Sequence, residues 1–94
     1  MKPMLVREAL GAALRDLRVD RGFTLREVAS SALVSVGYLS ELERGLKEAS
    51  SELLSGICEA LGTTEANVLA MASAKLAIAS ARDNVVPLFE RKAA

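Results

Sequence analysis

Few residues of this chain have the chemistry that catalysis needs. The 94-residue sequence contains no histidine and a single cysteine, Cys58, so it offers no Ser-His or Cys-His pair for nucleophilic attack. The carboxylates of Glu41 and Glu43 fall on different sides of a helix, because side chains two positions apart do not face each other. The sequence has no glycine-rich phosphate loop. These observations argue against an enzyme, and we expect no catalytic residue, no metal ion and no cofactor.

Polar residues are instead placed where helices begin. Thr24 and Glu27 have the spacing of a capping box, in which the threonine hydroxyl accepts a free N–H and the glutamate reaches back. Ser35 is suited to cap a second helix, which ends at Arg44. A turn of three or four residues separates these helices. Two short helices joined in this way form a helix-turn-helix, whose second helix fits the major groove of DNA.

Apolar residues recur at steps of three and four along most of the chain, as on the buried side of an amphipathic helix. The pattern predicts five helices, over residues 6–21, 25–31, 35–44, 51–61 and 65–82. Their expected inward faces are Val6, Leu10, Ala13, Leu14 and Leu17; Leu25, Val28 and Ala29; Tyr38, Leu39 and Leu42; Leu53, Leu54, Ile57, Cys58 and Leu61; and Val68, Leu69, Ala72, Leu76 and Ala79. With 51% hydrophobic but only 3% aromatic residues, we expect an all-α fold around one aliphatic core.

The charge is zero overall but unevenly divided. Residues 1–47 carry eight basic and six acidic residues, and residues 48–94 carry four basic and six acidic ones. A strongly basic surface is the usual sign of nucleic-acid binding. The neutral total speaks against it, whereas the basic excess lies in the half that holds the helix-turn-helix. No apolar run approaches the roughly 20 residues of a membrane span, and charges interrupt the N-terminal segment where a signal peptide would lie. We expect a cytoplasmic protein without membrane contact.

The residues around the predicted turn carry a family resemblance. They are Thr24-Leu25-Arg26-Glu27-Val28-Ala29, Val34-Ser35 and Tyr38-Leu39-Ser40-Glu41-Leu42-Glu43-Arg44-Gly45. This pattern resembles the phage-repressor and Cro type of helix-turn-helix regulators, also called the xenobiotic-response-element type, over about residues 10–68. The resemblance implies a five-helix, lambda-repressor-like DNA-binding domain and a double-stranded DNA operator as its partner.

Three segments, residues 24–28, 35–41 and 47–54, are similar more narrowly to actinobacterial regulators that activate Clp protease genes. This similarity implies a transcriptional activator of Clp protease and proteostasis genes in a stress response. RNA polymerase would then be a further partner. An antitoxin-like module that binds a partner protein is the alternative within the same fold.

The family pattern implies which side chains read base edges. Val36, Gly37, Ser40 and Glu41 would face the bases, with Val36 near a thymine methyl and Glu41 accepting from a cytosine amine. Ser35 is expected to act mainly as the helix cap and can also contact DNA. The alternative for Val36 and Glu41 is a solvated position without a DNA contact.

The same pattern implies phosphate contacts and one structural ion pair. Arg44 and Lys47 would bind phosphates after the recognition helix, and Thr24 would meet one at the start of the preceding helix. Glu43 would pair with Arg18 and tie the first helix to the third. Removing either partner would then leave an unpaired charge.

Three positions depart from the family pattern. Leu25 stands where the family usually has glutamine, Leu33 where it has glycine in the turn, and Ala49 where it has proline. The absence of glutamine removes one expected backbone contact with DNA. Leu33 would adopt its turn conformation at some cost if its φ is positive.

The fifth helix is long for a small domain and offers a seam for a homodimer. We expect a helix-turn-helix domain over residues 1–70, a dimerising continuation over residues 71–84 and a flexible tail over residues 85–94. Apolar residues lie on more than one side of this helix, whereas packing on a single core needs one. The alternative is that the helix packs only within its own chain. The expected interface residues are Leu69, Ala72, Leu76 and Ala79.

The chain ends in Ala93-Ala94 after a segment with no helical period. A small apolar terminus resembles the tails that Clp-type unfoldases recognise, and unstructured ends are where proteases engage a chain. This resemblance implies Clp protease as a partner through the tail. An inert, solvated tail is the alternative, and Lys92 departs from the usual signal.

Overall fold

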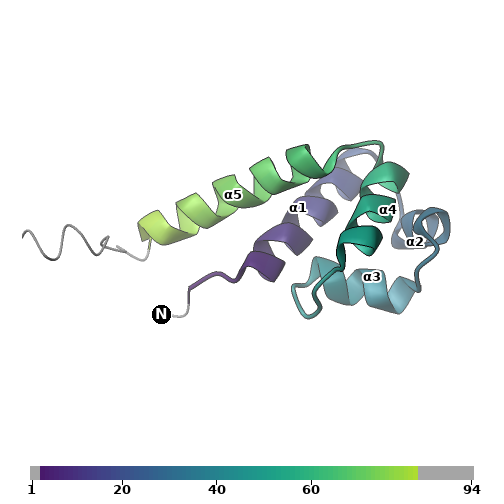
Figure 1. Ribbon diagram of the computed structural model, residues 1–94, viewed down its shortest axis with the longest axis horizontal. Helices are drawn as coiled ribbons and strands as arrows, with labels where there is room; N and C mark the ends of the chain where they lie inside the picture. Colours follow the sequence, from purple (N-terminus) through teal and green to yellow (C-terminus); the bar gives the residue numbers. More distant parts are fainter. Residues whose placement is uncertain (1–2, 83–94) are drawn as a thin grey trace, which may run out of the picture.

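The computed structural model describes residues 3–82, which form five helices (Figure 1). Their bounds are α1 Val6–Asp20, α2 Leu25–Ala32, α3 Val36–Glu43, α4 Ser51–Leu61 and α5 Glu65–Arg82. The all-helical, five-helix prediction is confirmed for these residues, and each helix begins and ends within two residues of its expected position. The reason is local: Thr24, Ser35 and Ser50 each accept a hydrogen bond from the backbone N–H three residues on.

The core is aliphatic, as the composition indicates. All five helices contribute side chains that are almost completely buried, and those of α2 are Val28 and Ala29. Burying one such leucine or isoleucine contributes about 1.5–3 kcal/mol. The largest fully buried side chains are Leu14, Leu39, Leu42, Ile57, Leu61 and Val68. Helices α2 and α3 are therefore held by their inner residues against α1 and α4.

Three residues expected on inward faces lie at the surface, namely Val6, Leu53 and, in α5, Leu69. Val6 is 59% exposed because it begins α1, at the end of the helix that extends past the core. Leu53 is exposed in the first turn of α4, and its neighbour Leu54 packs against the core in its place. Neighbouring residues differ by about 100° around a helix. The predicted helical period was therefore right, but the predicted inward face was too wide.

Helix α5 packs mainly along α1, and its last turns extend beyond the beginning of α1 (Figure 1). Val68 and Ala72 are the buried residues of α5, and Lys75 pairs with Asp16 of α1 at 2.6 Å. Leu69, by contrast, is 51% exposed. The inward face of α5 is thus narrower than the sequence pattern suggested.

One expected interface residue is placed wrongly by the sequence reasoning. Ala72 is only 3% exposed within the single chain, so it cannot lie on an outer surface of α5. Leu76 and Ala79 are half-buried. The expected tail over residues 85–94, with its Ala93-Ala94 end, lies outside the described residues. Within residues 3–82, none of the helices combines the length and apolar character that a bilayer crossing requires.

Candidate nucleic-acid interface

The turn between α2 and α3 contains a residue in the left-handed backbone conformation. Leu33 has φ 59° and ψ 41° and is 92% exposed. The backbone N–H of Leu33 donates to Ser30 O at 3.3 Å, and that of Val34 donates to Ala29 O at 3.0 Å. The φ of Leu33 is positive, which is the case in which this departure from the family pattern carries a steric cost. A non-glycine residue in this conformation costs about 1–2 kcal/mol, which the turn's backbone hydrogen bonds must offset.

Two side-chain caps fix where α2 and α3 begin. Thr24 Oγ1 accepts from the Glu27 backbone N–H at 3.1 Å, and the Thr24 N–H donates to Glu27 Oε1 at 2.9 Å. These bonds to Thr24 lower the pKa of the Glu27 carboxyl. Ser35 Oγ accepts from the Tyr38 N–H at 3.0 Å. A hydroxyl that accepts in a cap still has its proton to donate, so Thr24 and Ser35 remain able to bond to an oxygen of a partner.

The inner face of α3 is held from two directions. Leu39 and Leu42 are buried in the core. Tyr38 is half-buried and its hydroxyl donates to the Glu48 backbone oxygen at 3.1 Å. This bond ties α3 to the segment before α4. The helix therefore has little freedom to rotate about its own axis, and its outer face is fixed relative to the rest of the domain.

The outer face of α3 presents the residues that were expected to meet bases. Val36 is 38% exposed and Gly37 is exposed with open space around it, while Ser40 and Glu41 are half-buried. Positions four apart lie on one side of a helix, so these four residues and Arg44 share a face. The structure brings them together on one convex surface that begins at the Ser35 cap.

An ion pair joins the far end of α3 to α1. Arg18 Nε donates to Glu43 Oε2 at 2.7 Å and Arg18 Nη2 donates to Glu43 Oε1 at 3.0 Å. Arg18 Nη1 also donates to the Phe23 backbone oxygen at 2.9 Å. The hydrogen bond to Glu43 raises the pKa of Arg18 above its usual value. These are the two residues that the resemblance pairs, and Glu43 is buried.

One positioning residue was missed by the sequence reasoning. A Cβ on Gly11 of α1 would collide with the backbone oxygen of Leu42 and lie 2.8 Å from that of Glu43. Only glycine therefore lets α1 approach the end of α3 so closely. A glycine inside a helix costs about 1 kcal/mol relative to alanine, and its presence within the expected first helix was the signal that could have revealed this contact.

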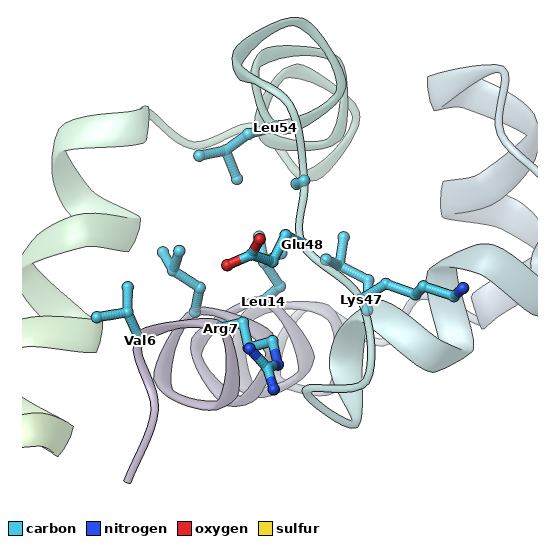
Figure 2. A pocket seen from close by; sticks show the side chains of 9 residues that line it. Val6, Arg7, Leu14, Lys47, Glu48 and Leu54 are labelled. Atoms are coloured by element: carbon cyan, nitrogen blue, oxygen red, sulfur yellow. The ribbon is translucent and has the colours of Figure 1, made fainter.

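A small hollow lies beside the end of α3 (Figure 2). Its volume is about 270 Å³, and its apolar lining comes from Val6, Leu10, Leu14, Leu42 and Leu54. Arg7, Lys47 and Glu48 stand around it, and the Lys47 side chain points away from it. Ala49, the residue in place of the family's proline, also lines it. Among the described residues, no three acidic, cysteine or histidine side chains gather as metal ligands would.

These features define a class of protein, and sequence comparison agrees. The family described as helix-turn-helix domain matches residues 9–71, and the chain belongs to this family. Among its relatives is the transcriptional regulator ClgR of Mycobacterium tuberculosis, which is 58% identical over 73 residues. That match covers 78% of this chain but 65% of the relative, so the chain spans somewhat less than two thirds of the length of that protein.

Solved structures show the same arrangement of helices. The clp gene regulator ClgR from Corynebacterium glutamicum is 55% identical, with 88% of each chain covered and a TM-score of 0.84. The wild-type restriction-modification controller protein C.Esp1396I shares the fold with a TM-score of 0.71 at 16% identity, over 78% of this chain and 94% of that one. At so low an identity, the second likeness concerns the fold alone.

Proposed function

We propose that this chain is a sequence-specific regulator of transcription that binds double-stranded DNA through α3. The observation that carries the proposal is the fixed outer face of α3, because a helix that recognises base edges must be held in one orientation. Core packing, the Tyr38 hydroxyl and the Arg18–Glu43 pair supply that fixation. The relatives named as transcriptional regulators support the same function.

The proposed contacts follow from where each side chain lies. Val36 and Gly37 face the bases from the first turn of α3, and Ser40 and Glu41 face them from the second. Gly37 has nothing within 4 Å of where a Cβ would be, so DNA can approach its backbone closely. Glu41 accepts from a cytosine amine and Val36 contacts a thymine methyl. A mutation at either residue would then change which base is preferred.

The phosphate contacts lie at the two ends of the motif. Arg44 caps the C-terminal end of α3 and Lys47 follows in the next loop, and both are exposed. Thr24 lies at the start of α2 with its hydroxyl proton available. Contacts of this kind position the protein on the duplex and carry no sequence information. They supply affinity that falls as the salt concentration rises.

The regulator acts as a homodimer through α5 in this proposal. One recognition helix alone reads few bases, whereas a two-fold dimer reads two half-sites about 34 Å apart. Leu69 and Leu76 are seven residues apart and so lie on the same side of α5, and the 51% exposure of Leu69 leaves apolar surface there. Ala79 is the third interface residue, half-buried beside them.

The target genes are proposed from the relatives. Two solved structures at 55% and 60% identity are described as the clp gene regulator ClgR, and we infer that this chain regulates clp genes too. It does so as an activator that contacts RNA polymerase at the promoter.

The decisive experiment selects bound duplexes from a random library and then compares the enriched sequence with clp promoter regions. Enrichment of a two-fold symmetric site that occurs upstream of clp genes is the expected result. Enrichment of a symmetric site absent from those promoters would contradict the assignment to clp genes but still support sequence-specific DNA binding. No enrichment over input would contradict DNA recognition itself.

A further inference from the structure

We propose that Arg7 of α1 is a fourth phosphate-binding residue, which acts beside Arg44 and Lys47 and is held in place by the backbone of Gly45. The inference rests on the proposed DNA-binding function and adds a residue outside the helix-turn-helix to its interface. Arg7 is part of neither the recognition helix nor the turn.

The first turn of α1 touches the backbone that follows α3. Arg7 Nε donates to the Gly45 backbone oxygen at 3.2 Å. Gly45 is buried with φ 74°, and a Cβ there would lie 2.8 Å from the Cα of Glu8. Glu8 is itself anchored, because its Oε1 accepts from the Leu5 N–H at 2.7 Å. Arg7 is therefore fixed relative to the two residues that flank Gly45 in sequence, Arg44 and Leu46.

Arg7 and Arg18 both donate hydrogen bonds from α1, but they use their guanidinium groups differently. Arg18 donates from Nε, Nη1 and Nη2 to protein acceptors, so its nitrogens are all engaged inside the fold. Arg7 donates from Nε alone, and within residues 3–82 its Nη atoms have neither a hydrogen-bond acceptor nor an acidic partner. A guanidinium with a free Nη edge matches a phosphate through two parallel hydrogen bonds.

Basic residues outnumber acidic ones around Gly45, because Arg7, Arg44 and Lys47 stand against Glu8 and Glu48. Arg7 and Lys47 both line the hollow beside α3, and their charged ends point away from Leu54 on its far side (Figure 2). Arg44 is one residue before Gly45 and exposed. Of the residues that line this hollow, Glu48 is the acidic one, and its carboxylate points into the hollow (Figure 2). This surplus of positive charge favours an anion such as a DNA phosphate over a cation at this end of the domain.

The inference is tested by the salt dependence of DNA binding in the full chain. Arg7→Gln removes the charge but keeps a side-chain N–H that can donate to the Gly45 oxygen. Affinity is measured by fluorescence anisotropy between about 50 and about 200 mM salt, on a selected site and on a random duplex. We expect the slope of log K against log salt to fall in magnitude by about 0.9. The loss of affinity should be the same factor on both duplexes.

Arg15→Gln is the matched control. Arg15 lies on the same helix and is exposed, but it lines a different depression, shared with Asp16, Asp20 and Glu43. Its removal changes the net charge equally and should leave the slope unchanged. A second variant, Arg7→Lys, retains the charge and should keep a slope close to that of the parent. If Arg7→Gln does not fold, Arg7→Met, which also removes the charge, takes its place with the same expected fall in slope.

Each result has a defined meaning. An unchanged slope in Arg7→Gln, or a slope in Arg7→Lys that falls by about 0.9, overturns the inference. An equal fall in Arg15→Gln does so too, because net charge alone would then explain the effect. A parent chain that binds no duplex overturns the proposed function along with the inference, whereas a parent that binds while Arg7→Gln keeps the full slope overturns the inference alone.

Discussion

Arg18 and Glu43 form a two-point ion pair that fastens the end of α3 to α1, with N–O distances of 2.7 and 3.0 Å. Their side chains are 13% and 5% exposed, so water screens the pair only weakly. The third donor of Arg18 holds the Phe23 backbone oxygen in the segment before α2. One side chain therefore connects α1, the entry to α2 and the end of α3.

We expect Arg18→Ala to destabilise the fold by about 3–5 kcal/mol, because it leaves a buried carboxylate without its partner. Chemical denaturation of the variant measures this change directly. Arg15→Ala on the exposed side of α1 is the control and should change the unfolding midpoint little. Equal stability of the Arg18→Ala variant and the parent would show that the pair contributes nothing net.

Leu33→Gly should stabilise the protein by about 1 kcal/mol, because glycine adopts the φ of 59° found at this position without a steric cost. The 92% exposed leucine side chain has little packing to lose. Leu46→Gly is the control, since Leu46 is also exposed but has no positive φ. It should destabilise through the added freedom of the unfolded chain. A lower thermal midpoint for Leu33→Gly would show that the side chain makes a stabilising contact.

The sequence predicted best what depends on neighbours along the chain. The caps at Thr24 and Ser35 involve residues three positions apart, so their spacing is visible without a structure. The place of Leu33 in the turn likewise marked it as a position where a positive φ would carry a cost, and its φ is 59°. The Arg18–Glu43 pair spans 25 positions and was accessible only through the family resemblance, since no local rule relates two such residues.

What was missed depends on how helices lie against one another. Gly11 matters because the backbone oxygens of Leu42 and Glu43 approach it. A glycine within the first helix signals a close contact but does not identify the residues that make it. Ala72 was assigned to an outer seam because apolar residues surround α5 on several sides. Which side faces α1 is decided by packing, and that side includes Ala72. Periodicity gives the existence of a helix but, for a helix this rich in alanine, does not give its orientation.

Val36→Ala and Glu41→Ala should change the sequence that is bound while the fold is retained. Each base contact discriminates by about 1–3 kcal/mol, so preference at one base pair should weaken by roughly 5- to 150-fold. Selection from a random library with each variant measures this. The control is Ser51→Ala, an exposed residue in the first turn of α4 and outside α3. Identical preferences in the parent and both variants would place the readout elsewhere.

Arg44→Ala and Lys47→Ala should weaken binding to all duplexes by a similar factor. Both side chains are exposed at or after the end of α3, where they would neutralise phosphates without touching bases. Removing one phosphate-binding charge should reduce the magnitude of the salt slope by about 0.9. Titrations on a selected and on a random duplex at several salt concentrations give both quantities. If a variant instead alters the preference at one base pair, the replaced residue contacts a base rather than a phosphate.

Leu69→Glu should convert a dimer to a monomer and weaken binding to a symmetric site. Leu69 is 51% exposed on α5, so a charge there adds little strain within one chain but would be buried without a partner in a dimer. It is a cleaner test than Leu76→Glu, because Leu76 is half-buried in the single chain. Ile78→Glu is the matched control, since Ile78 is similarly exposed but lies on the opposite side of α5. The two residues are nine positions apart, so their side chains point about 180° apart around the helix axis. Light scattering gives the oligomeric state, and thermal unfolding verifies that both variants are folded. A dimer that persists in Leu69→Glu and dissociates in Ile78→Glu would move the interface to the other side of α5.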